Sequence, residues 1–353
     1  MRVGIDARKL ADFGIGTYIR GLLGALVELG GGDEYVAFAP PGARLPDGVE
    51  HVVSDAPHYS VRELVSVGRA ADRAGLDVFH APHYVVPFTK VPVVVTIHDL
   101  IHLHQPQRNP AARIYARAML GRAVKKARVV LTVTEAVKRQ LVEELGARNV
   151  RVTPNGVSSG AAAAPAAGVS GEVGGRSDRH STGDASNYFL YVGNDKPHKN
   201  VGTLVEAAKR ANVRLVLVGA PFERFDGVEK RGFVSDGELS ALYSGALALV
   251  LPSLEEGFGL PAAEAMAHGA AVITSLDPAL VEITGDAALH ADARDAGALA
   301  EAMRRVASDG ALRAELGAKG RERARLFTWK RCAELTREVY EEARTRGTSW
   351  NVG

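Results

Sequence analysis

The sequence predicts an α/β protein made of two doubly wound domains, each with a parallel sheet covered by helices on both faces. Short runs of β-branched residues alternate with helical patterns along most of the chain, which is the order that parallel sheets produce. Several runs, such as 91–95 and 214–218, are almost continuously apolar, as strands buried on both faces are. At 353 residues, the chain also exceeds the length that a single core usually organises.

A low-complexity run of Ala, Gly and Ser at 158–186 separates the two halves and predicts a flexible linker. We therefore expect a first domain at 1–157 and a second at 187–328, facing each other across a cleft. The amphipathic pattern from about 329 to 345 predicts a last helix that crosses back onto the first domain.

The expected strands direct attention to the loops that follow them. In the first domain they lie near 2–6, 34–38, 76–80, 91–97, 128–133 and 149–152, and in the second near 188–193, 213–219, 246–251 and 270–274, with a weaker one at 230–234. Ligands of open α/β sheets bind outside the carboxyl ends of the strands. The post-strand loops are therefore the places to search for a site.

Composition limits the classes of partner and compartment. With 43 lysines and arginines against 41 aspartates and glutamates, the net charge is +2, so nothing global favours nucleic acid. The single cysteine, Cys332, excludes an intrachain disulfide and fits a reducing compartment. The start, 1–6, resembles a first strand rather than a signal peptide, and no apolar run is long enough to span a bilayer. We expect a cytoplasmic protein, or one that touches a membrane only from the side.

The segment 254–264 is the most informative part of the chain. Two carboxylates, Glu256 and Glu264, enclose a glycine loop, and Pro261 suits the first turn of a helix. The amino end of that helix would offer free N–H groups to a phosphate. Both carboxylates make sense there if each accepts hydrogen bonds from sugar hydroxyls, one from a hexose and one from a ribose. The alternative is a surface loop followed by a glutamate that favours the helix dipole.

A second loop, 193–201, follows an expected strand and carries two lysines and a histidine at the start of a helix. Lysines are unfavourable at that end of a helix unless they serve an anion. Lys199 is therefore the candidate for neutralising a pyrophosphate leaving group. The alternative is a solvated basic loop.

In the first domain, Gly14 and Gly16 open a helix after the first strand. The spacing is similar to a dinucleotide-binding glycine loop, but Ile19 occupies the third glycine position. The two glycines indicate either a close approach to a phosphate or a plain tight turn.

After the strand at 91–97 come His98 and Asp99, which are placed to hydrogen-bond sugar hydroxyls or to steady a developing charge. Four more histidines lie nearby in sequence, at positions 80, 83, 102 and 104. Their spacing puts no ligand pair on one helix face and no cysteine joins them, so we expect no metal site.

A basic helix without any acidic residue is predicted at 108–126. Basic amphipathic helices can lie on anionic membrane surfaces, which would suit a lipid-linked acceptor. A solvated basic helix is the ordinary alternative.

Taken together, these motifs resemble the retaining family 4 glycosyltransferases of GT-B fold, which have two Rossmann-like domains. The resemblance covers nearly the whole chain except the linker, and its most specific element is the Glu-x7-Glu motif of Glu256 and Glu264. Supporting matches lie at 14–17, 96–100, 153–157, 192–200 and 231–234.

The resemblance implies roles for individual residues. The second domain would hold the nucleotide sugar and the first the acceptor. Glu256 would contact the donor hexose, Glu264 the ribose hydroxyls and Lys199 the diphosphate. His98, Lys199 and Glu256 form the predicted catalytic set, and the predicted substrate-binding set is Gly14, Gly16, Asp99, Asn194, Lys196, Phe233, Val234, Gly257, Phe258, Gly259, Leu260 and Glu264. Phe233 and Val234 correspond to the segment that borders the base. Many relatives have arginine at the positions of Asn194 and His198, and Lys196 offers a replacement charge.

The expected reaction uses no cofactor and no metal, because no Asp-x-Asp occurs in the chain. The donor would be GDP-mannose or, close behind, a UDP-hexose, and the acceptor a glycan, a lipid-linked sugar or a small molecule. Retention of configuration without an evident nucleophile favours front-face attack. Three alternatives remain at this point: a noncatalytic nucleotide-sugar binder, another GT-B enzyme such as an epimerase or phosphorylase, and, with least support, a dinucleotide oxidoreductase.

Overall fold

The computed structural model describes residues 1–56, 60–104, 110–157, 187–219 and 221–345. The chain divides into two compact units, unit 1 formed by Met1–Gly156 with Phe327–Gly353 and unit 2 by Val157–Leu326. The segment 158–186, predicted as a linker, lies outside the described residues, as do Arg108 and Asn109 at the start of the predicted basic helix.

Unit 1 contains a seven-stranded sheet in the order β3-β2-β1-β4-β5-β6-β7, and every pair of neighbouring strands is parallel. The chain order reverses between β1 and β4, so this sheet has its topological switch point there. The strands are β1 (Arg2–Asp6), β2 (Glu34–Ala39), β3 (Glu50–Val53), β4 (Val78–Ala81), β5 (Val93–Thr96), β6 (Val129–Thr132) and β7 (Val150–Val152).

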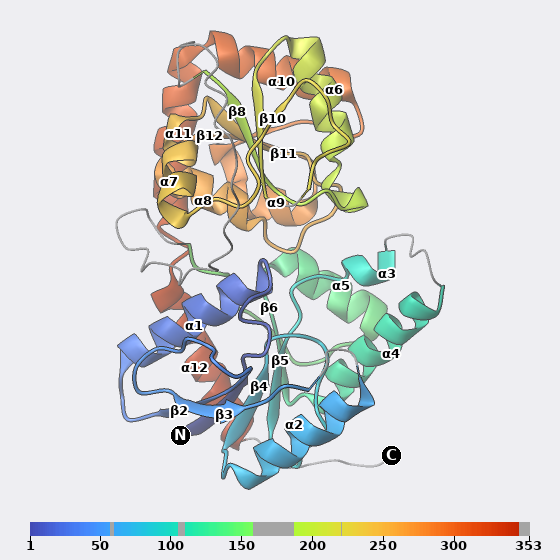
Figure 1. Ribbon diagram of the computed structural model, residues 1–353, viewed down its shortest axis with the longest axis vertical. Coiled ribbons are helices and arrows are strands. Elements are labelled where there is room, and N and C mark those ends of the chain that lie inside the picture. The colour runs from blue at the N-terminus through green and yellow to red at the C-terminus, as the bar shows by residue number, and fades with distance from the viewer. Residues whose placement is uncertain (57–59, 105–109, 158–186, 220, 346–353) are drawn as a thin grey trace. The chain divides into compact units, whose positions relative to one another are not determined.

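Helices cover both faces of this sheet (Figure 1). They are α1 (Ile15–Leu29), α2 (Val61–Arg73), α3 (Ile101–His104), α4 (Pro110–Lys126), α5 (Glu135–Leu145) and α12 (Trp329–Thr345). Successive residues of β5 alternate between two cores: Val93 and Val95 pack in the cluster with α2 and α4, and Val94 packs in the cluster with α1 and α12. Burial on both faces explains the continuous apolar runs of the sequence.

The last helix returns to unit 1 and is fixed there by polar contacts. Nδ1 of the buried His80 lies 2.7 Å from the Tyr340 hydroxyl, and the guanidinium of Arg128 donates to the Ala343 carbonyl at 2.7 Å. Cys332 is buried in the same packing. These contacts explain why an amphipathic helix at the end of the chain folds onto the first sheet.

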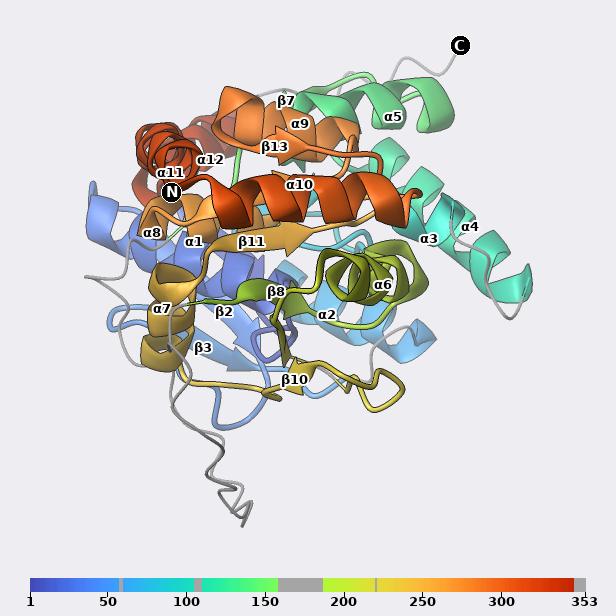
Figure 2. The same ribbon diagram turned by 90° about the horizontal axis from the view of Figure 1, so that it is seen from above.

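Unit 2 repeats the architecture with six parallel strands in the order β10-β9-β8-β11-β12-β13. The strands are β8 (Phe189–Gly193), β9 (Leu215–Gly219), β10 (Glu229–Lys230), β11 (Ala248–Leu251), β12 (Ala271–Thr274) and β13 (Leu289–His290). Its helices are η1 (Pro197–Lys199), α6 (Val201–Ala211), α7 (Asp236–Gly245), α8 (Leu260–His268), α9 (Pro278–Thr284), η2 (Gly285–Ala287), α10 (Ala296–Ser308) and α11 (Gly310–Ala324). Helices α6 and α10 run side by side (Figure 2), and α8 packs against α11. The switch point lies between β8 and β11.

Three strands differ from the sequence prediction. The weak strand expected at 230–234 begins earlier and is shorter, since β10 covers only Glu229 and Lys230 and the chain turns at Gly232, where φ is +38°. The edge strands β3 and β13 were not anticipated, because three of the four residues of β3 are exposed and β13 has only two residues. The other expected strands are found with ends shifted by at most two residues.

No helix in the described part of the chain combines the length and the apolar character that crossing a membrane requires.

Candidate active site

Strands β8 and β11 are neighbours at the switch point of unit 2, and the loops that follow them come together at the carboxyl edge of the sheet. Leu190 of β8 is in register with Leu249 of β11. The loop after β8 carries Lys199 and the loop after β11 carries Glu256. The sequence prediction placed each residue in its loop, and the strand order brings the two loops side by side.

Lys199 and Glu256 form an ion pair there. Lys199 Nζ lies 2.5 Å from Glu256 Oε1, and only 17% and 9% of the two side chains are exposed. The Ser253 hydroxyl donates to the same carboxylate oxygen at 2.7 Å. The carboxylate is thus held between an ammonium and a hydroxyl, both within hydrogen-bond distance of one oxygen.

Backbone contacts fix the loop that presents Lys199. The Leu254 amide donates to the His198 carbonyl at 2.7 Å, and His198 itself is 7% exposed. Asn200 adopts a left-handed conformation with φ +55°, and its side-chain amide donates to the carbonyls of Pro252 and Ala293 at 3.3 and 2.6 Å. His198 and Asn200 therefore join the two loops and hold Lys199 in place.

Asp277 is a further member of the site that the sequence analysis missed. It follows β12, accepts from the Glu256 amide at 3.3 Å, and caps α9 by accepting from the amides of Ala279 and Leu280 at 3.0 and 3.1 Å. Burial, with the negative charge of Glu256, raises the pKa of Asp277 to about 6. The Asp277-Pro278 pair at the end of an expected strand is a helix-start signal that could have located it.

The glycine loop ends in a sharp turn at Gly259, which precedes α8. Gly259 has φ +81°, and a Cβ at this position would lie 2.4 Å from Leu280 Cδ2. Only glycine satisfies both constraints. Gly257, Phe258 and Gly259 are all buried, Phe258 to 4% exposure, while Leu260 is half-buried. The Phe258 side chain therefore presents little surface to a ligand.

Glu264 lies one turn into α8 and contacts α7. The Tyr243 hydroxyl donates to Glu264 Oε2 at 2.7 Å, and the Tyr243 ring stacks on His268 at a centroid distance of 5.3 Å. Burial raises the pKa of the Glu264 carboxyl to about 7, and the Tyr243 hydrogen bond opposes that shift. With a pKa of about 7, the charged and neutral forms of this carboxyl are both populated near neutral pH.

The remaining predicted residues of unit 2 differ in exposure. The Asn194 carbonyl accepts from the Tyr191 hydroxyl at 2.8 Å, and its side chain accepts from the Lys196 amide at 3.2 Å. The Lys196 side chain is exposed. Phe233 is 76% exposed and Val234 is half-buried, on the segment after β10.

In unit 1, the predicted glycine loop and His98 meet at the carboxyl edge of the sheet. Gly14 has φ +77° and precedes α1, and a Cβ on Gly16 would lie 2.4 Å from the Leu10 carbonyl oxygen. The Tyr18 ring contacts His98 edge-on at 4.7 Å. Among the described residues, nothing pairs with the buried Nε2 of His98, and burial lowers the pKa of this imidazole. The lowered pKa favours the neutral form of the His98 imidazole.

The other residues of the predicted histidine group have structural roles or lie apart. Asp99 accepts from the Ile101 amide at 3.1 Å at the start of α3. His80 is fully buried, bonded through Nε2 to Thr96 at 2.7 Å, and burial lowers its pKa to about 3. His104 pairs with Glu144 at 2.9 Å. Within the described ranges, no three His, Cys, Asp or Glu side chains are grouped so as to hold a metal ion.

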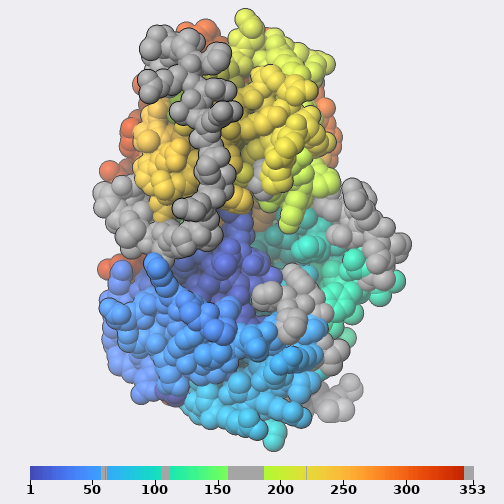
Figure 3. Space-filling model, in the orientation of Figure 1, coloured from blue at the N-terminus to red at the C-terminus, as the bar shows by residue number. Residues whose placement is uncertain are grey.

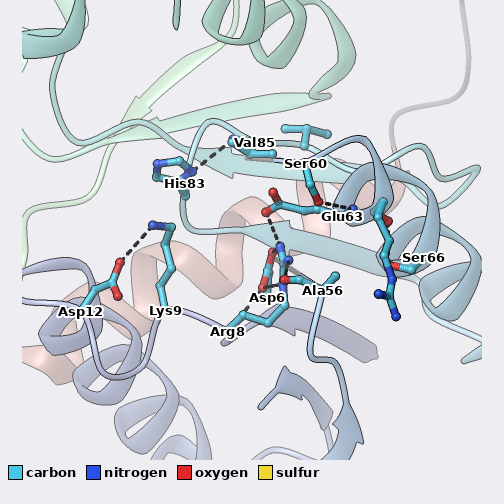
Figure 4. A network of polar contacts seen from close by, with 12 residues as sticks. Asp6, Arg8, Lys9, Asp12, Ala56, Ser60, Glu63, Ser66, His83 and Val85 are labelled. Carbon is cyan, nitrogen blue, oxygen red and sulfur yellow. Dashed lines mark hydrogen bonds and ion pairs between the residues drawn. The ribbon is translucent and has the colours of Figure 1, made fainter. Parts of the chain in front are cut away.

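A buried charge cluster at the switch point of unit 1 was also missed (Figure 4). Arg8 donates to Asp6 and Glu63 at 2.6 and 2.7 Å, and all three residues are buried. Although burial opposes it, contact with the two carboxylates raises the pKa of Arg8 above its ordinary value. Lys9 and Asp12 form a second pair at 2.9 Å beside it. The Asp-x-Arg spacing at the end of β1 was the available signal.

Comparison with known families accounts for this arrangement. Residues 14–160 match the family model described as Glycosyltransferase Family 4, and residues 177–323 match the model described as Glycosyl transferases group 1. The chain belongs to the family 4 glycosyltransferases. It is therefore an enzyme that transfers sugars, and its two Rossmann-like sheets form a GT-B fold.

Individual relatives agree with this assignment. O-antigen chain mannosyltransferase B of Escherichia coli is 25% identical over 284 residues, covering 75% of this chain and 74% of that one. O-antigen chain mannosyltransferase RfbU of Salmonella typhimurium is 30% identical over 230 residues, 60% of each chain. The solved sucrose-phosphate synthase of Thermosynechococcus elongatus superposes with a TM-score of 0.77 at 23% identity, covering 97% of this chain and 98% of that one. At this level of identity, the similarity to sucrose-phosphate synthase shows that the two proteins share a fold.

Proposed function

We propose that this glycosyltransferase moves a hexose, mannose as first choice, from a nucleotide diphosphate sugar to a glycan, a lipid-linked sugar or a small-molecule acceptor. The ion pair of Lys199 and Glu256 at the switch point of unit 2 carries the proposal. Two relatives named as mannosyltransferases support the choice of sugar. We propose GDP-mannose as the first candidate donor and UDP-hexoses as the second.

Binding of the donor would rearrange the ion pair of Lys199 and Glu256. A diphosphate that approaches Lys199 competes with Glu256 for the ammonium, because both are anions. Once the ammonium turns to the diphosphate, the Glu256 carboxylate is available to hydroxyls of the donor hexose. The amino end of α8 adds N–H groups that favour an anion.

Glu264 is proposed to accept hydrogen bonds from the ribose hydroxyls, with Phe233 and Val234 bordering the base. Its contact with Tyr243 fixes one carboxylate oxygen, Oε2, so the other is available to a ligand. An alternative in which Glu264 only favours the helix dipole would not need a tyrosine partner or a burial that raises its pKa.

Unit 1 is proposed to bind the acceptor and to contribute His98, Gly14 and Gly16 to the reaction site. The unpaired Nε2 of the neutral His98 suits an outer hydroxyl of the sugar. Asp99, Asn194 and Lys196 remain proposed contacts of the substrate.

The proposed chemistry needs no metal and no cofactor. The acceptor hydroxyl attacks the anomeric carbon on the face from which the diphosphate leaves, so the configuration is retained. The bond from that carbon to the diphosphate oxygen breaks, and a phosphate oxygen takes the hydroxyl proton. Lys199 and the loop amides meet the charge that develops on the leaving diphosphate.

Helix α4 is proposed to contact the anionic inner face of a membrane from the side. It contains Arg113, Arg117, Arg122, Lys125 and Lys126 and no acidic residue, and Ile114 is 71% exposed on it. Such a helix would keep the enzyme near a lipid-linked acceptor.

A thermal-shift screen with UDP, GDP, ADP and their hexose conjugates, without added metal, tests the donor class, since a ligand of the folded state raises the midpoint. We expect a shift with one base that is lost in Glu264→Ala and kept in the neighbouring control Glu255→Ala. Release of nucleoside diphosphate in the presence of an acceptor then separates transfer from mere binding. Binding without turnover for every acceptor would favour a noncatalytic binder, and no shift at millimolar concentration would reject the nucleotide-sugar assignment.

A further inference from the structure

An open depression of about 850 Å³ lies on unit 1 between the ends of α2 and α4 and the loop that precedes β5. The α2 segment, in light blue, and the α4 segment, in teal, lie at the surface of this unit (Figure 3). The lining carries five cationic side chains and one aromatic ring, which belong to Lys90, Arg117, Arg122, Lys125, Lys126 and Phe88.

The depression lies at the amino edge of the sheet, opposite to the edge that carries the candidate active site. The lining residues of α4 occupy its last turns, just before β6 begins at Val129, and residues 88–90 come just before β5 begins at Val93. Because all strands are parallel, these points share one edge. A four-residue strand spans roughly 13 Å. The depression is thus separated from His98 at the carboxyl end of β5.

The positive charge of this depression is only partly neutralised. No ion pair in the described part of the chain joins its five cations to a carboxylate, whereas other arginines, such as Arg2, Arg151, Arg214 and Arg304, have acidic partners. The only acidic residue in the lining is Asp72. Its carboxylate already accepts from the Thr89 hydroxyl and the Lys90 amide at 2.5 and 2.8 Å. Although burial opposes it, these hydrogen bonds and the positive charge of Lys90 lower the pKa of Asp72. This one carboxylate therefore offsets only part of the charge of the five cations.

Arg122 is held in place by the protein rather than by an acid. Its guanidinium donates to the carbonyls of Val86 and Pro87 and lies over the Phe88 ring, 4.3 Å from the centroid. Arg122 is partly buried and has no carboxylate partner, and this burial lowers the pKa of its guanidinium. A bound anion would therefore compensate the charge of Arg122. Phe88 remains 52% exposed, so an apolar surface adjoins the oriented guanidinium.

We propose that this depression binds the phosphate group of an amphiphilic or soluble phosphate ester, with Arg122 and Arg117 as forked donors and the lysines as point charges. Arginine matches the geometry of phosphate oxygens, and several cations around one concave surface suit a group of more than one negative charge. Phe88 would contact the organic part of the ester. This site rests on the membrane contact proposed for α4 and specifies the chemical group that α4 would recognise there. The site lies away from the acceptor hydroxyl that reacts in the proposed transfer.

The experiment compares the full-length protein with the variant Arg117→Gln, Lys125→Gln. The control Arg139→Gln, Arg148→Gln removes the same charge from exposed positions of unit 1 outside the depression. Affinity is measured at 0.15 M NaCl for inorganic pyrophosphate and glycerol 3-phosphate in one arm. In the other arm, it is measured for phosphatidylcholine vesicles with and without phosphatidylglycerol.

We expect binding by the wild type and the control, and affinity weaker by about tenfold or more in the depression variant. Binding of the soluble esters would identify a free phosphate ligand, and binding of the anionic vesicles alone would identify a lipid headgroup. Absence of binding in both arms, or equal loss in the variant and the control, would overturn the inference. Donor-induced thermal shifts measured on the same variants separate this outcome from failure of the proposed transferase, because both variants keep every residue of the proposed donor site.

Discussion

Lys199 Nζ and Glu256 Oε1 are 2.5 Å apart although 57 positions separate them in the sequence. The contact exists because β8 and β11 are adjacent in the second sheet, and each residue follows one of these strands. An ammonium and a carboxylate thus neutralise each other at the point where doubly wound sheets bind ligands. A substrate with a diphosphate and hydroxyl groups offers replacement partners to both.

Removing the cation tests its part in the reaction. Lys199→Ala should lower turnover by about 100-fold or more, because a charge on the leaving diphosphate loses its counter-ion. Binding of the nucleoside monophosphate should change much less. Steady-state kinetics and thermal shifts measure the two effects, with Lys209→Ala on the exposed face of α6 as control. Near-normal turnover of Lys199→Ala would remove Lys199 from the mechanism.

The same pair predicts a coupling in stability. Lys199→Ala leaves the Glu256 carboxylate, only 9% exposed, without its ammonium, so we expect a loss of about 1–3 kcal/mol in urea unfolding. Adding Glu256→Gln removes the unpaired charge and should restore part of that loss. A double-mutant cycle measures the coupling. Strictly additive effects of the two substitutions would mean that the interaction between Lys199 and Glu256 does not stabilise the fold.

Glu264 makes both stability and nucleotide binding depend on pH. Its pKa of about 7 exceeds the ordinary value of 4.5, so the folded state holds this proton more tightly than the unfolded chain does. Ionisation of Glu264 therefore lowers the free energy of unfolding as the pH rises from about 4.5 to 7, by at most about 3 kcal/mol. Relative to wild type, Glu264→Gln should gain stability toward pH 8.

Nucleotide affinity should increase as the pH rises, because the ionised carboxylate of Glu264 accepts more hydrogen bonds from a ribose diol than the protonated form does. We expect the wild type to bind the nucleoside diphosphate more tightly at pH 8 than at pH 6, and Glu264→Gln to lose that trend. Calorimetric titration at both pH values measures it. An unchanged pH trend in Glu264→Gln would assign the dependence to another group.

The sequence was sufficient for those features that depend on local patterns. The strands of both sheets are apolar because they are buried on both faces, and Lys199 and Glu256 stand in loops that directly follow such strands. Their pairing was not predictable, since it depends on which strands are neighbours. Asp277 reaches the Glu256 amide across 21 positions for the same reason. The short strand β3 escaped detection because it lies at an edge and keeps polar side chains.

Gly259 is predicted to be irreplaceable at the start of α8. Gly259→Ala combines a φ of +81° with a Cβ 2.4 Å from Leu280, and we expect a loss of roughly 1–3 kcal/mol. Gly24→Ala in α1 is the matched control, since nothing lies within 4 Å of its Cβ, and it should be neutral or stabilising by about 0.5–1 kcal/mol. Thermal unfolding compares the two. Equal stability of Gly259→Ala and wild type would contradict the described turn.

The cluster at the switch point of unit 1 gives the last prediction. Arg8→Met leaves two buried carboxylates, Asp6 and Glu63, without their shared cation, and should cost about 3–5 kcal/mol. The exposed pair of Lys138 with Glu135 provides the control, and Lys138→Met should cost less than about 1 kcal/mol. Adding Asp6→Asn and Glu63→Gln to Arg8→Met should recover most of the loss, since no buried charge then remains. Urea unfolding of the four proteins measures these differences, and a failure of the triple variant to recover would show that Arg8 acts through packing rather than charge.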